Sequence, residues 1–536
     1  MDAATVYRRR WLILAVLSMC LVLSGLDALV IAMAVPKMQV ALGASVSQMQ
    51  WSVDAYTLAF GGLLLFAGSL ADRYGHKLVL LTGLVVMLGF SLGAAFSGDA
   101  STLIVCRAGM GLGAALVMPS TLAIIKYVFP PGEQARAISV WSGAAGLGIP
   151  LGPVIGGLLL NHFWWGSIFL INVPVVVIAL IGGFVLIPVW RSPKRSSLDP
   201  LGALLTVAGL VVLVYGLIEA PTHGWGSATT VICLVGGVVL LAAFGAWESR
   251  ASNAMLPIEL FRNRRFSGAV VALGCQAFAL FGSLFVLTQY FQDARAYEPL
   301  TAGVRLLALC TLIISSLLAP RVVAALGEKV TIILGLLIIA AGAFTLSTAH
   351  TQNETLVLVS LGIMGFGIGL SIPPSVDGIL GSAPEHQAGT ASAMNDTALQ
   401  VGGAIGVAVL GSVMTASYRN ALPNLTGLPA AMQQGAKNSI GGALEVAGHA
   451  GRGGAGLISE ATRAFGSGLD SAATAALVVA LFGVVATAAI MPRRSQPRRP
   501  GRRVSDGTDT RSAATSALAE CARRVRGPGT PPRVIP

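Results

Sequence analysis

Long runs of apolar residues recur along the chain, separated by short segments rich in Gly, Pro and charged residues. A helix needs about 20 predominantly apolar residues to cross the hydrocarbon core of a bilayer. Runs of that length predict fourteen membrane spans. They begin near Trp11, Gln50, Leu78, Ser101, Ala135, Trp165, Leu201, Ala228, Phe266, Thr301, Val330, Leu356, Ala388 and Ser471. The pattern therefore predicts an all-α membrane protein.

The composition supports this prediction. Only 11% of the 536 residues are charged and 54% are hydrophobic, whereas a soluble domain averages about 25% charged residues. This deficit excludes a soluble enzyme, a disordered chain and a nucleic-acid-binding domain, and it makes the lipid bilayer the principal partner. The six cysteines have no paired spacing that would indicate a zinc site or a disulfide framework.

The net charge of +12 is concentrated at the C-terminus. Eleven Arg and three acidic residues give 492–536 a net charge of +8. Because Pro, Gly and Ser are interleaved with the Arg residues, we expect a disordered basic tail, with contact to anionic lipid as a further possibility.

The placement of Lys and Arg between the spans indicates an orientation. With the N-terminus in the cytoplasm, the N-terminal segment and the short inner loops hold sixteen of these residues, whereas the short outer loops hold only Lys37 and Arg295. Cytoplasmic loops carry an excess of Lys and Arg. Both termini are therefore expected in the cytoplasm.

The spans are predicted to form two six-helix halves, 1–190 and 260–491, with an extra pair of spans in 191–259. A faint repeat supports two halves, because Gly75-His76-Lys77 follows the second span and Gly327-Glu328-Lys329 follows the tenth. Two six-span halves are the arrangement of the major facilitator fold, whose site lies at mid-membrane between them. The segment 418–470 is expected to be an outer loop, and its sequence indicates no role.

Three motifs give the chain a resemblance to a known family. The first span contains Asp27 followed by Ala34-Val35-Pro36, the loop after the second span reads GSLADRYGHK over 68–77, and the fifth span reads GIPLGPVIGG over 148–157. In combination they resemble the fourteen-span drug:proton antiporters of the major facilitator superfamily. The string at 148–157 resembles the motif associated with antiporters.

The chain departs from the family pattern at three positions. His76 stands where the loop motif has Arg, Met110 stands where Arg-x-x-Gln-Gly has Gln, and Gly166 stands where the family often has Arg. Met110 removes a hydrogen-bonding group near Arg107, which cannot lose its proton and needs an acidic or carbonyl partner inside a helical bundle.

An ion gradient is the expected energy source, because the sequence contains no phosphate-binding loop of the G-x-x-x-x-G-K-[ST] type. Coupling to protons requires carboxyl groups inside the bundle that gain and lose a proton. In the resembling exporters of cationic drugs, acids in spans 1, 2 and 13 have this role and recognise substrate. The corresponding acids are Asp27, Asp54 and Asp396, and together with Arg107 of the fourth span they are the candidates for proton coupling and substrate binding.

Each acid also has a structural alternative. Asp27 is alternatively a permanent partner of Arg107, and Asp54 a hydrated residue at the outer interface. Asp396 is alternatively a packing residue satisfied by Asn395 or Gln400.

Two motifs are candidates for conformational change. The loop after the second span is expected to act as a switch in which the Asp72 carboxylate engages a helix N-terminus in one state only. Its residues are Gly68, Asp72, Arg73, Gly75 and Lys77. The fifth span is expected to be a smooth, bent gate helix, with simple packing as the alternative. Its residues are Gly148, Pro150, Gly152, Pro153, Gly156 and Gly157.

The resemblance implies a secondary transporter of the bacterial cytoplasmic membrane that exports amphipathic, cationic drugs or dyes in exchange for protons. A dedicated exporter of one metabolite, such as a self-made antibiotic or a lipid, is the alternative. A membrane enzyme or sensor is disfavoured, because no nucleophile and base or metal-ligand cluster is recognisable. We expect a monomer without cofactor or metal.

Overall fold

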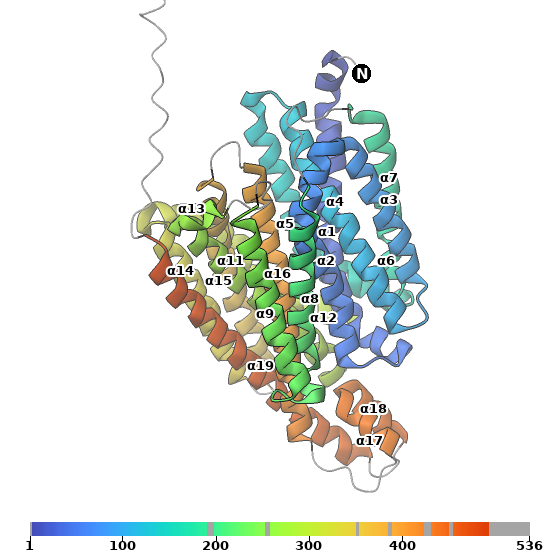
Figure 1. The fold of residues 1–536 in the computed structure, drawn as a ribbon. Coiled ribbons are helices and arrows are strands. Elements are labelled where there is room, and N and C mark those ends of the chain that lie inside the picture. Colours follow the sequence, from blue (N-terminus) through green and yellow to red (C-terminus); the bar gives the residue numbers. More distant parts are fainter. Residues whose placement is uncertain are drawn as a thin grey trace, which may run out of the picture. The chain divides into compact units, whose positions relative to one another are not determined.

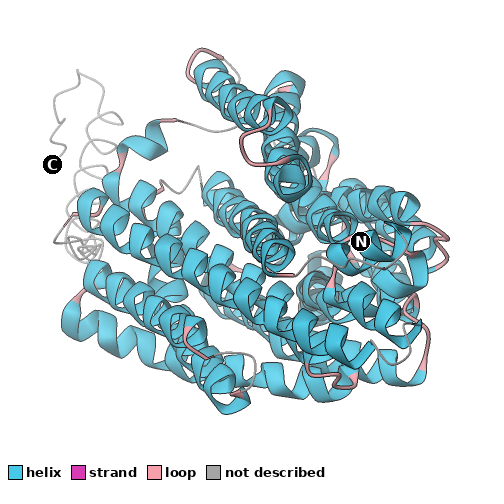
Figure 2. Cartoon of the chain, turned by 90° about the horizontal axis from the view of Figure 1, so that it is seen from below, coloured by secondary structure: helices cyan, strands magenta, loops and turns pink. Residues whose placement is uncertain are grey.

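The computed structural model describes residues 3–189, 198–251, 258–349, 353–383, 388–422, 430–449 and 454–492. The tail expected over 492–536 lies outside these residues, apart from Pro492. Figure 2 shows helices throughout the described part and no strand in it.

The helices fall into an N-terminal set, α1 to α7, a central pair, α8 and α9, and a C-terminal set, α10 to α19 (Figure 1). The first set comprises α1 (Ala3–Leu42), α2 (Val46–Tyr74), α3 (His76–Ala95), α4 (Ala100–Val128), α5 (Pro131–His162), α6 (Ser167–Leu170) and α7 (Asn172–Leu186). The pair is α8 (Pro200–His223) and α9 (Ala228–Glu248). The last set comprises α10 (Glu259–Arg262), α11 (Arg264–Gln289), the π-helix η1 (Tyr290–Ala294), α12 (Pro299–Leu306), the 3₁₀ turn η2 (Leu307–Cys310), α13 (Thr311–Leu326), α14 (Glu328–Ser347), α15 (Glu354–Leu380), α16 (Ala388–Ala421), α17 (Ala430–Asn438), α18 (Ile440–His449) and α19 (Gly454–Ile490).

Thirteen of the described helices are long and apolar enough to cross a membrane. Some are composite: α6 and α7 form one span, α11 continues into η1, and α12, η2 and α13 form another. The fifth predicted span is α5, a helix of 32 residues whose part Leu151–His162 is apolar but short. The all-α membrane fold is thus confirmed.

The segment 418–470, expected as an outer loop, is largely helical. α16 continues to Ala421, α19 already begins at Gly454, and α17 and α18 lie between them. Tyr418 holds this hairpin, because its hydroxyl donates to the carbonyl oxygens of Ala436 (2.9 Å) and Ser439 (3.3 Å). The segment has no long apolar run, so a prediction based on membrane-spanning apolar runs does not include its helices.

Small residues allow close approach of helices in both sets. In the N-terminal set, a Cβ at Gly111 of α4 would collide with the carbonyl oxygen of Tyr56 on α2. In the C-terminal set, a Cβ at Gly406 of α16 would collide with the carbonyl oxygen of Phe278 on α11. Such contacts are typical of helices that pack within a bilayer.

The central pair lies beside the junction of the two sets. α8 buries Leu210, Val214 and Ile218 against Leu58 of α2 and Ala404 of α16. α9 packs on α8 and exposes most of its apolar side chains. α8 therefore contacts both sets, whereas α9 lies on the outer surface of the bundle.

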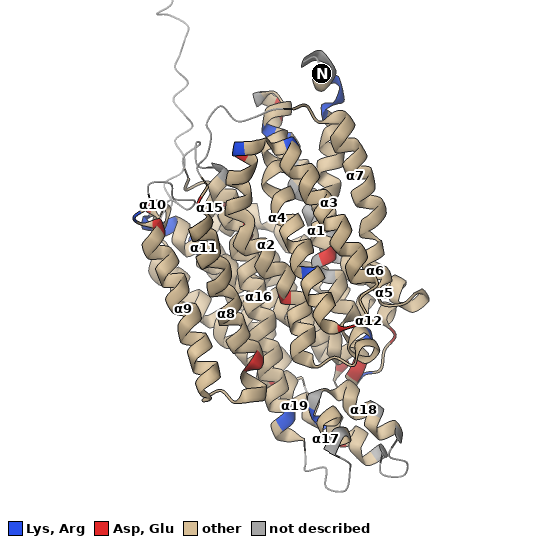
Figure 3. Ribbon diagram, turned by 45° about the vertical axis from the view of Figure 1, so that its right-hand side comes forward, with Lys and Arg blue, Asp and Glu red and all other residues tan. Residues whose placement is uncertain are grey.

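The two sets meet at one end of the bundle. We call this the far end, where α1 ends and α2 begins, and the opposite end, where α1 begins, the near end (Figure 1). At the far end, Asn161 of α5 donates to Glu298 before α12 (3.0 Å), and Gln292 of η1 donates to the carbonyl oxygen of Met33 on α1 (2.8 Å). Figure 3 shows that most charged residues of the described part lie toward the two ends, with few at mid-depth.

Candidate functional site

α1 and α4 bring Asp27 and Arg107 together inside the bundle. Nη1 of Arg107 donates to Oδ2 of Asp27 at 2.5 Å, and the side chains are 0% and 3% exposed for Arg107 and Asp27. Nε of Arg107 donates to the carbonyl oxygen of Ser52 (3.0 Å), and the guanidinium carbon lies 4.4 Å from the centre of the Tyr56 ring. A buried charge without a partner is strongly unfavourable, so each charge depends on the other.

Two further polar residues, Asn172 and Ser91, hold the other side of Asp27. Nδ2 of Asn172 donates to Oδ1 of Asp27 (3.0 Å) and to Oγ of Ser91 (3.1 Å), and Ser91 in turn donates to the carbonyl oxygen of Phe169 (2.8 Å). Sequence reasoning did not assign them a role. The sequence shows only that each is a polar residue within an apolar run, and the structure shows that both side chains are fully buried. Both oxygens of Asp27 thus accept hydrogen bonds, as a carboxylate anion does.

Met110, which stands where the family motif has Gln, changes the hydrogen bonding of Arg107. Met110 is fully buried on α4, one turn from Arg107, and it offers no oxygen to the guanidinium. Nη2 of Arg107 has no hydrogen-bond partner among the described residues. The charge of Arg107 is therefore balanced mainly through Asp27.

Asp54 is fully buried on α2, and neither carboxyl oxygen has a hydrogen-bond partner in the described part of the chain. It lies one turn from Gln50, whose Nε2 donates to the carbonyl oxygens of Val407 (3.1 Å) and Ala408 (3.2 Å) on α16. Gly61, seven residues after Asp54, also packs on α16. Residues spaced by four and seven share one helix face. Asp54 therefore lies on the face of α2 that packs against α16, and we call this junction the α2–α16 seam.

Asp396 lies on α16, nearer the near end. It is half-buried, and Nδ2 of Asn395 donates to its Oδ1 (3.1 Å). The next residue, Thr397, donates to the carbonyl oxygen of Gly61 on α2 (3.2 Å). Gln400, one turn further along α16, has an Oε1 without a partner among described residues. The structure therefore does not bring Asp396 into the Asp27–Arg107 pair.

The loop motif at 68–77 ends α2 and begins α3. Gly75 has φ of 105°, which favours glycine, and the imidazole of His76 lies 3.3 Å from the Asp72 carboxylate. Nζ of Lys77 donates to the carbonyl oxygens of Phe184 (2.8 Å) and Ile187 (2.7 Å) at the end of α7. Gly68 packs on a proline of α4, and Arg73 is exposed.

The same arrangement recurs in the C-terminal set. Gly327 has φ of 85°, and Nζ of Lys329 donates to the carbonyl oxygens of Ala488 and Met491 at the end of α19, both at 2.6 Å. Each lysine thus satisfies carbonyl groups at the C-terminal end of the last long helix of its set. The faint sequence repeat corresponds to a structural one.

The α5 motif forms part of the contact between the two sets. Gly156 packs on Met33 of α1, whereas a Cβ at Gly157 would collide with the backbone of Pro299 and Leu300 at the start of α12. The carbonyl group of Pro153 fills the position that a side chain at Gly303 of α12 would need. Gly152 is buried, and the surroundings of Gly148 and Pro150 lie outside the described residues.

A family model described as Major Facilitator Superfamily matches residues 17–407. The chain belongs to this superfamily. The transporter is 34% identical over 504 residues to the tetracenomycin C resistance and export protein of Streptomyces glaucescens, covering 91% of this chain and 93% of that one. It is 33% identical to the multidrug efflux pump LfrA of Mycolicibacterium smegmatis (90% and 96% covered) and 30% identical to the methyl viologen resistance protein SmvA of Salmonella typhimurium (82% and 89%).

Solved structures support the same fold. A bacterial homologue of the lysosomal transporter Spinster, in an inward-facing and unoccupied conformation, aligns with a TM-score of 0.63 at 16% identity over 91% of this chain and 99% of that one. The major facilitator fold and the relation to drug and antibiotic efflux pumps are therefore confirmed, as is a secondary transporter rather than an enzyme.

Proposed function

We propose that this transporter exports amphipathic, cationic organic compounds across the bacterial cytoplasmic membrane in exchange for protons. The observation that carries the proposal is the carboxyl group of Asp54, fully buried without a partner in the α2–α16 seam. A carboxylate there would cost several kcal/mol. Asp54 therefore carries a proton while this seam is closed.

The orientation sets the direction of exchange. Lys and Arg are in excess on the segments we assign to the near end, so this end faces the cytoplasm. The far end, where α5 meets α12 and Gln50 meets α16, is then closed to the outside. On this assignment we propose a transporter in which the halves 1–190 and 260–491 rock about the extra pair, with the contacts of the far end closed in this structure and the loop at 68–77 as the switch.

The acids differ in this state. Asp27 accepts hydrogen bonds from Arg107 and Asn172, whereas neither carboxyl oxygen of Asp54 has a donor among the described residues. We assign proton uptake from the outside to Asp54 and proton release toward the cytoplasm to Asp27 and Asp396. Gln400 lies between the levels of Asp54 and Asp396 on α16 and offers an unused oxygen to a proton relay.

The substrate class rests on the names of the relatives and on the charge of the site. Methyl viologen, to which SmvA confers resistance, is an organic dication. Asp396 is a half-buried carboxyl group next to Thr397, which bonds to α2, and it has no Lys or Arg partner in the described part of the chain. Once Asp396 has lost its proton, a cationic substrate balances the negative charge of the carboxylate.

Export of a single antibiotic is a second candidate, because one relative of nearly equal length is a tetracenomycin C resistance and export protein. Competition separates the two candidates. A dedicated exporter ignores unrelated cations, whereas the proposed exporter is inhibited by several of them.

Transport in inside-out membrane vesicles tests the proposal directly. With an acidic lumen, vesicles that contain the protein should accumulate ethidium, because outward proton flow drives the dye inward. A difference of two pH units supports about a hundredfold gradient for one proton per substrate. Accumulation that survives collapse of the pH gradient by nigericin, without any membrane potential, would exclude proton exchange.

A far-end cross-link should stop transport by preventing the outward opening. Asn161→Cys combined with Glu298→Cys places two thiols on opposite sides of this contact, where the longer wild-type side chains bond at 3.0 Å, so a short bifunctional methanethiosulfonate reagent can join them. Cross-linking with this reagent is expected to abolish ethidium uptake, and dithiothreitol to restore it, with each single variant as control. Full transport by a quantitatively cross-linked protein would contradict a far end that opens.

A further inference from the structure

Gln50 of α2 joins the two helix sets at the far end of the α2–α16 seam. It is 1% exposed, and its Nε2 donates to the carbonyl oxygens of Val407 (3.1 Å) and Ala408 (3.2 Å). Gly411, the next turn of α16, makes room for the amide, because a Cβ there would collide with Nε2. The amide therefore occupies a seat on α16 that depends on the absence of a side chain at residue 411.

The amide of Gln50 has a second acceptor within reach. Asp54 lies one turn further along α2, and neither of its carboxyl oxygens has a hydrogen-bond partner in the described part of the chain. Side chains spaced by four on a helix are neighbours, and Gln and Asp at this spacing form hydrogen bonds. Nε2 carries two N–H groups, and the two carbonyl oxygens of α16 account for both. Gln50 therefore bonds either to α16 or to Asp54.

The two acceptors differ in what they lose when the amide leaves. Val407 and Ala408 lie inside α16, which continues to Ala421, so their carbonyl oxygens keep their helical hydrogen bonds. An ionised Asp54, in contrast, requires a donor, and hydrogen bonds to a charged acceptor are about twice as strong as neutral ones. Ionisation of Asp54 therefore draws the amide of Gln50 away from α16.

The other charged groups around this part of α2 leave Asp54 to Gln50. The acids, bases and tyrosines on the helices packed against it are Asp27 of α1, His76 and Lys77 of α3, Arg107 of α4, Tyr215 and Glu219 of α8, and Asp396, Tyr418 and Arg419 of α16. Arg107 pairs with Asp27, and Glu219 accepts from Oγ of Ser47 (3.0 Å). The groups of α3 and α16 lie toward the ends of the seam. No described residue donates to the Asp54 carboxyl group.

We propose that Gln50 is a positioning residue that exchanges α16 for Asp54 as its partner and so makes closure of the far end depend on the proton of Asp54. With Asp54 protonated, the amide sits against Gly411 and the far end is closed, as in this structure. With Asp54 ionised, the amide bonds to the carboxylate and the far end stays open. The inference rests on the proposed proton uptake by Asp54 and names the residue through which that proton acts.

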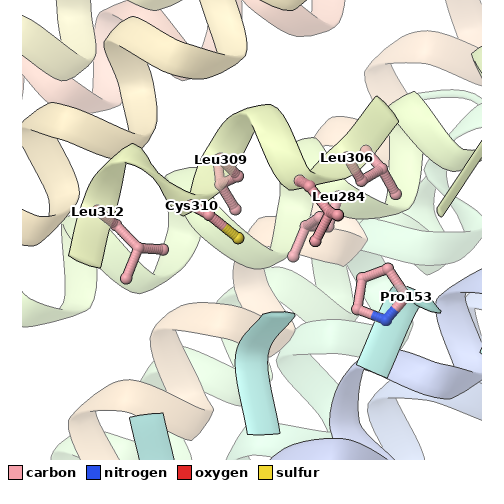
Figure 4. Close-up of a pocket in the computed structure, with 7 residues that line it drawn as sticks. Pro153, Leu284, Leu306, Leu309, Cys310 and Leu312 are labelled. Carbon is pink, nitrogen blue, oxygen red and sulfur yellow. The ribbon is translucent and has the colours of Figure 1, made fainter. Parts of the chain in front are cut away.

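The distance between α5 and α12 at the far end measures closure. In this structure Pro153 of α5 and Leu306 of α12 line one small pocket at their contact (Figure 4). His162 at the end of α5 and Val304 of α12 are exposed, so both can carry spin labels, in a background without the six natural cysteines. Pulsed EPR on the purified full-length protein then gives the closed population at each pH. This population should rise as the pH falls.

Two variants separate partner exchange from a simple latch. Gly411→Ala displaces the amide from α16 and leaves it to Asp54, so the midpoint of closure should move to lower pH by about one unit. Gln50→Leu keeps the volume of the buried side chain but loses both sets of bonds. Because the bond that holds the far end open is also gone, its midpoint should lie about one unit or more above that of Gly411→Ala. Gln48→Leu, which changes only the cap of α2 at Ser45, is the matched control and should leave the midpoint unchanged.

An Asp54→Asn background measures any direct effect of the methyl group at residue 411. Without the carboxylate, Gly411→Ala and Gln50→Leu should lower the closed population to a similar extent. Equal midpoints of the two variants in the presence of Asp54, or a difference of the same size in the Asn background, would overturn the inference. A wild-type distance that ignores pH would overturn it together with proton uptake by Asp54. Ethidium accumulation is measured separately: a normal pH response of the distance without accumulation would contradict the export proposal alone.

Discussion

Replacing Asp54 with Asn is expected to abolish accumulation driven by a pH gradient while leaving substrate exchange intact. Asn has the shape of the protonated acid and cannot release a proton, so the α2–α16 seam should close as in the wild type. Under a gradient of two pH units, ethidium accumulation should fall from about a hundredfold to about onefold. Counterflow of labelled ethidium against unlabelled ethidium, without a pH gradient, should remain.

Asp199→Asn is the matched control. Asp199 is also buried, but it lies before α8 and accepts hydrogen bonds from Nε1 of Trp247 (2.8 Å) and the backbone of Gly202 (2.9 Å). Its loss should lower stability without changing the dependence of uptake on the gradient. If Asp54→Asn accumulates ethidium as the wild type does, Asp54 takes no part in coupling.

The spans were predictable because a bilayer imposes a length and a composition on each helix. The tenth span shows the limit of that argument. Its apolar run is continuous, and the break at Leu307–Cys310 depends on Gly365 and its neighbours, about 55 residues later in the chain. Helices α17 and α18 escaped prediction for the opposite reason, since they are short and stand outside any apolar run of spanning length.

The site was predictable in its residue types and only partly in its pairings. A buried Arg107 needed an acidic partner, and Asp27 was one of the alternatives considered. Burial of Asp54 was not evident, because hydration at the outer interface was the alternative that the sequence left open. That Asp54 lies on the face of α2 toward α16 follows from the hydrogen bonds of Gln50 to α16, which only the folded structure shows. Asn172 was not predicted as a site residue, because a single amide side chain within an apolar run does not indicate which group it bonds to.

Replacing Asp27 with Asn is expected to impair both folding and transport. The change leaves Arg107 charged and without an ionic partner, since its other hydrogen-bond acceptor is the carbonyl oxygen of Ser52. Breaking a buried pair in this way costs about 3–5 kcal/mol. The melting temperature of the purified protein in detergent should fall markedly, and ethidium uptake should be lost. A melting temperature equal to that of the wild type would contradict the buried pair.

The double variant Asp27→Asn with Arg107→Gln separates the two effects. Two neutral side chains can bond to each other and to Asn172, so most of the lost stability should return, because replacing both members of a buried pair is often neutral. Proton-driven uptake should remain absent, because neither residue can exchange a proton or a charge. A stable double variant that accumulates ethidium would make the pair structural and leave coupling to Asp54 and Asp396. The double variant therefore tests directly whether Asp27 is only a permanent partner of Arg107.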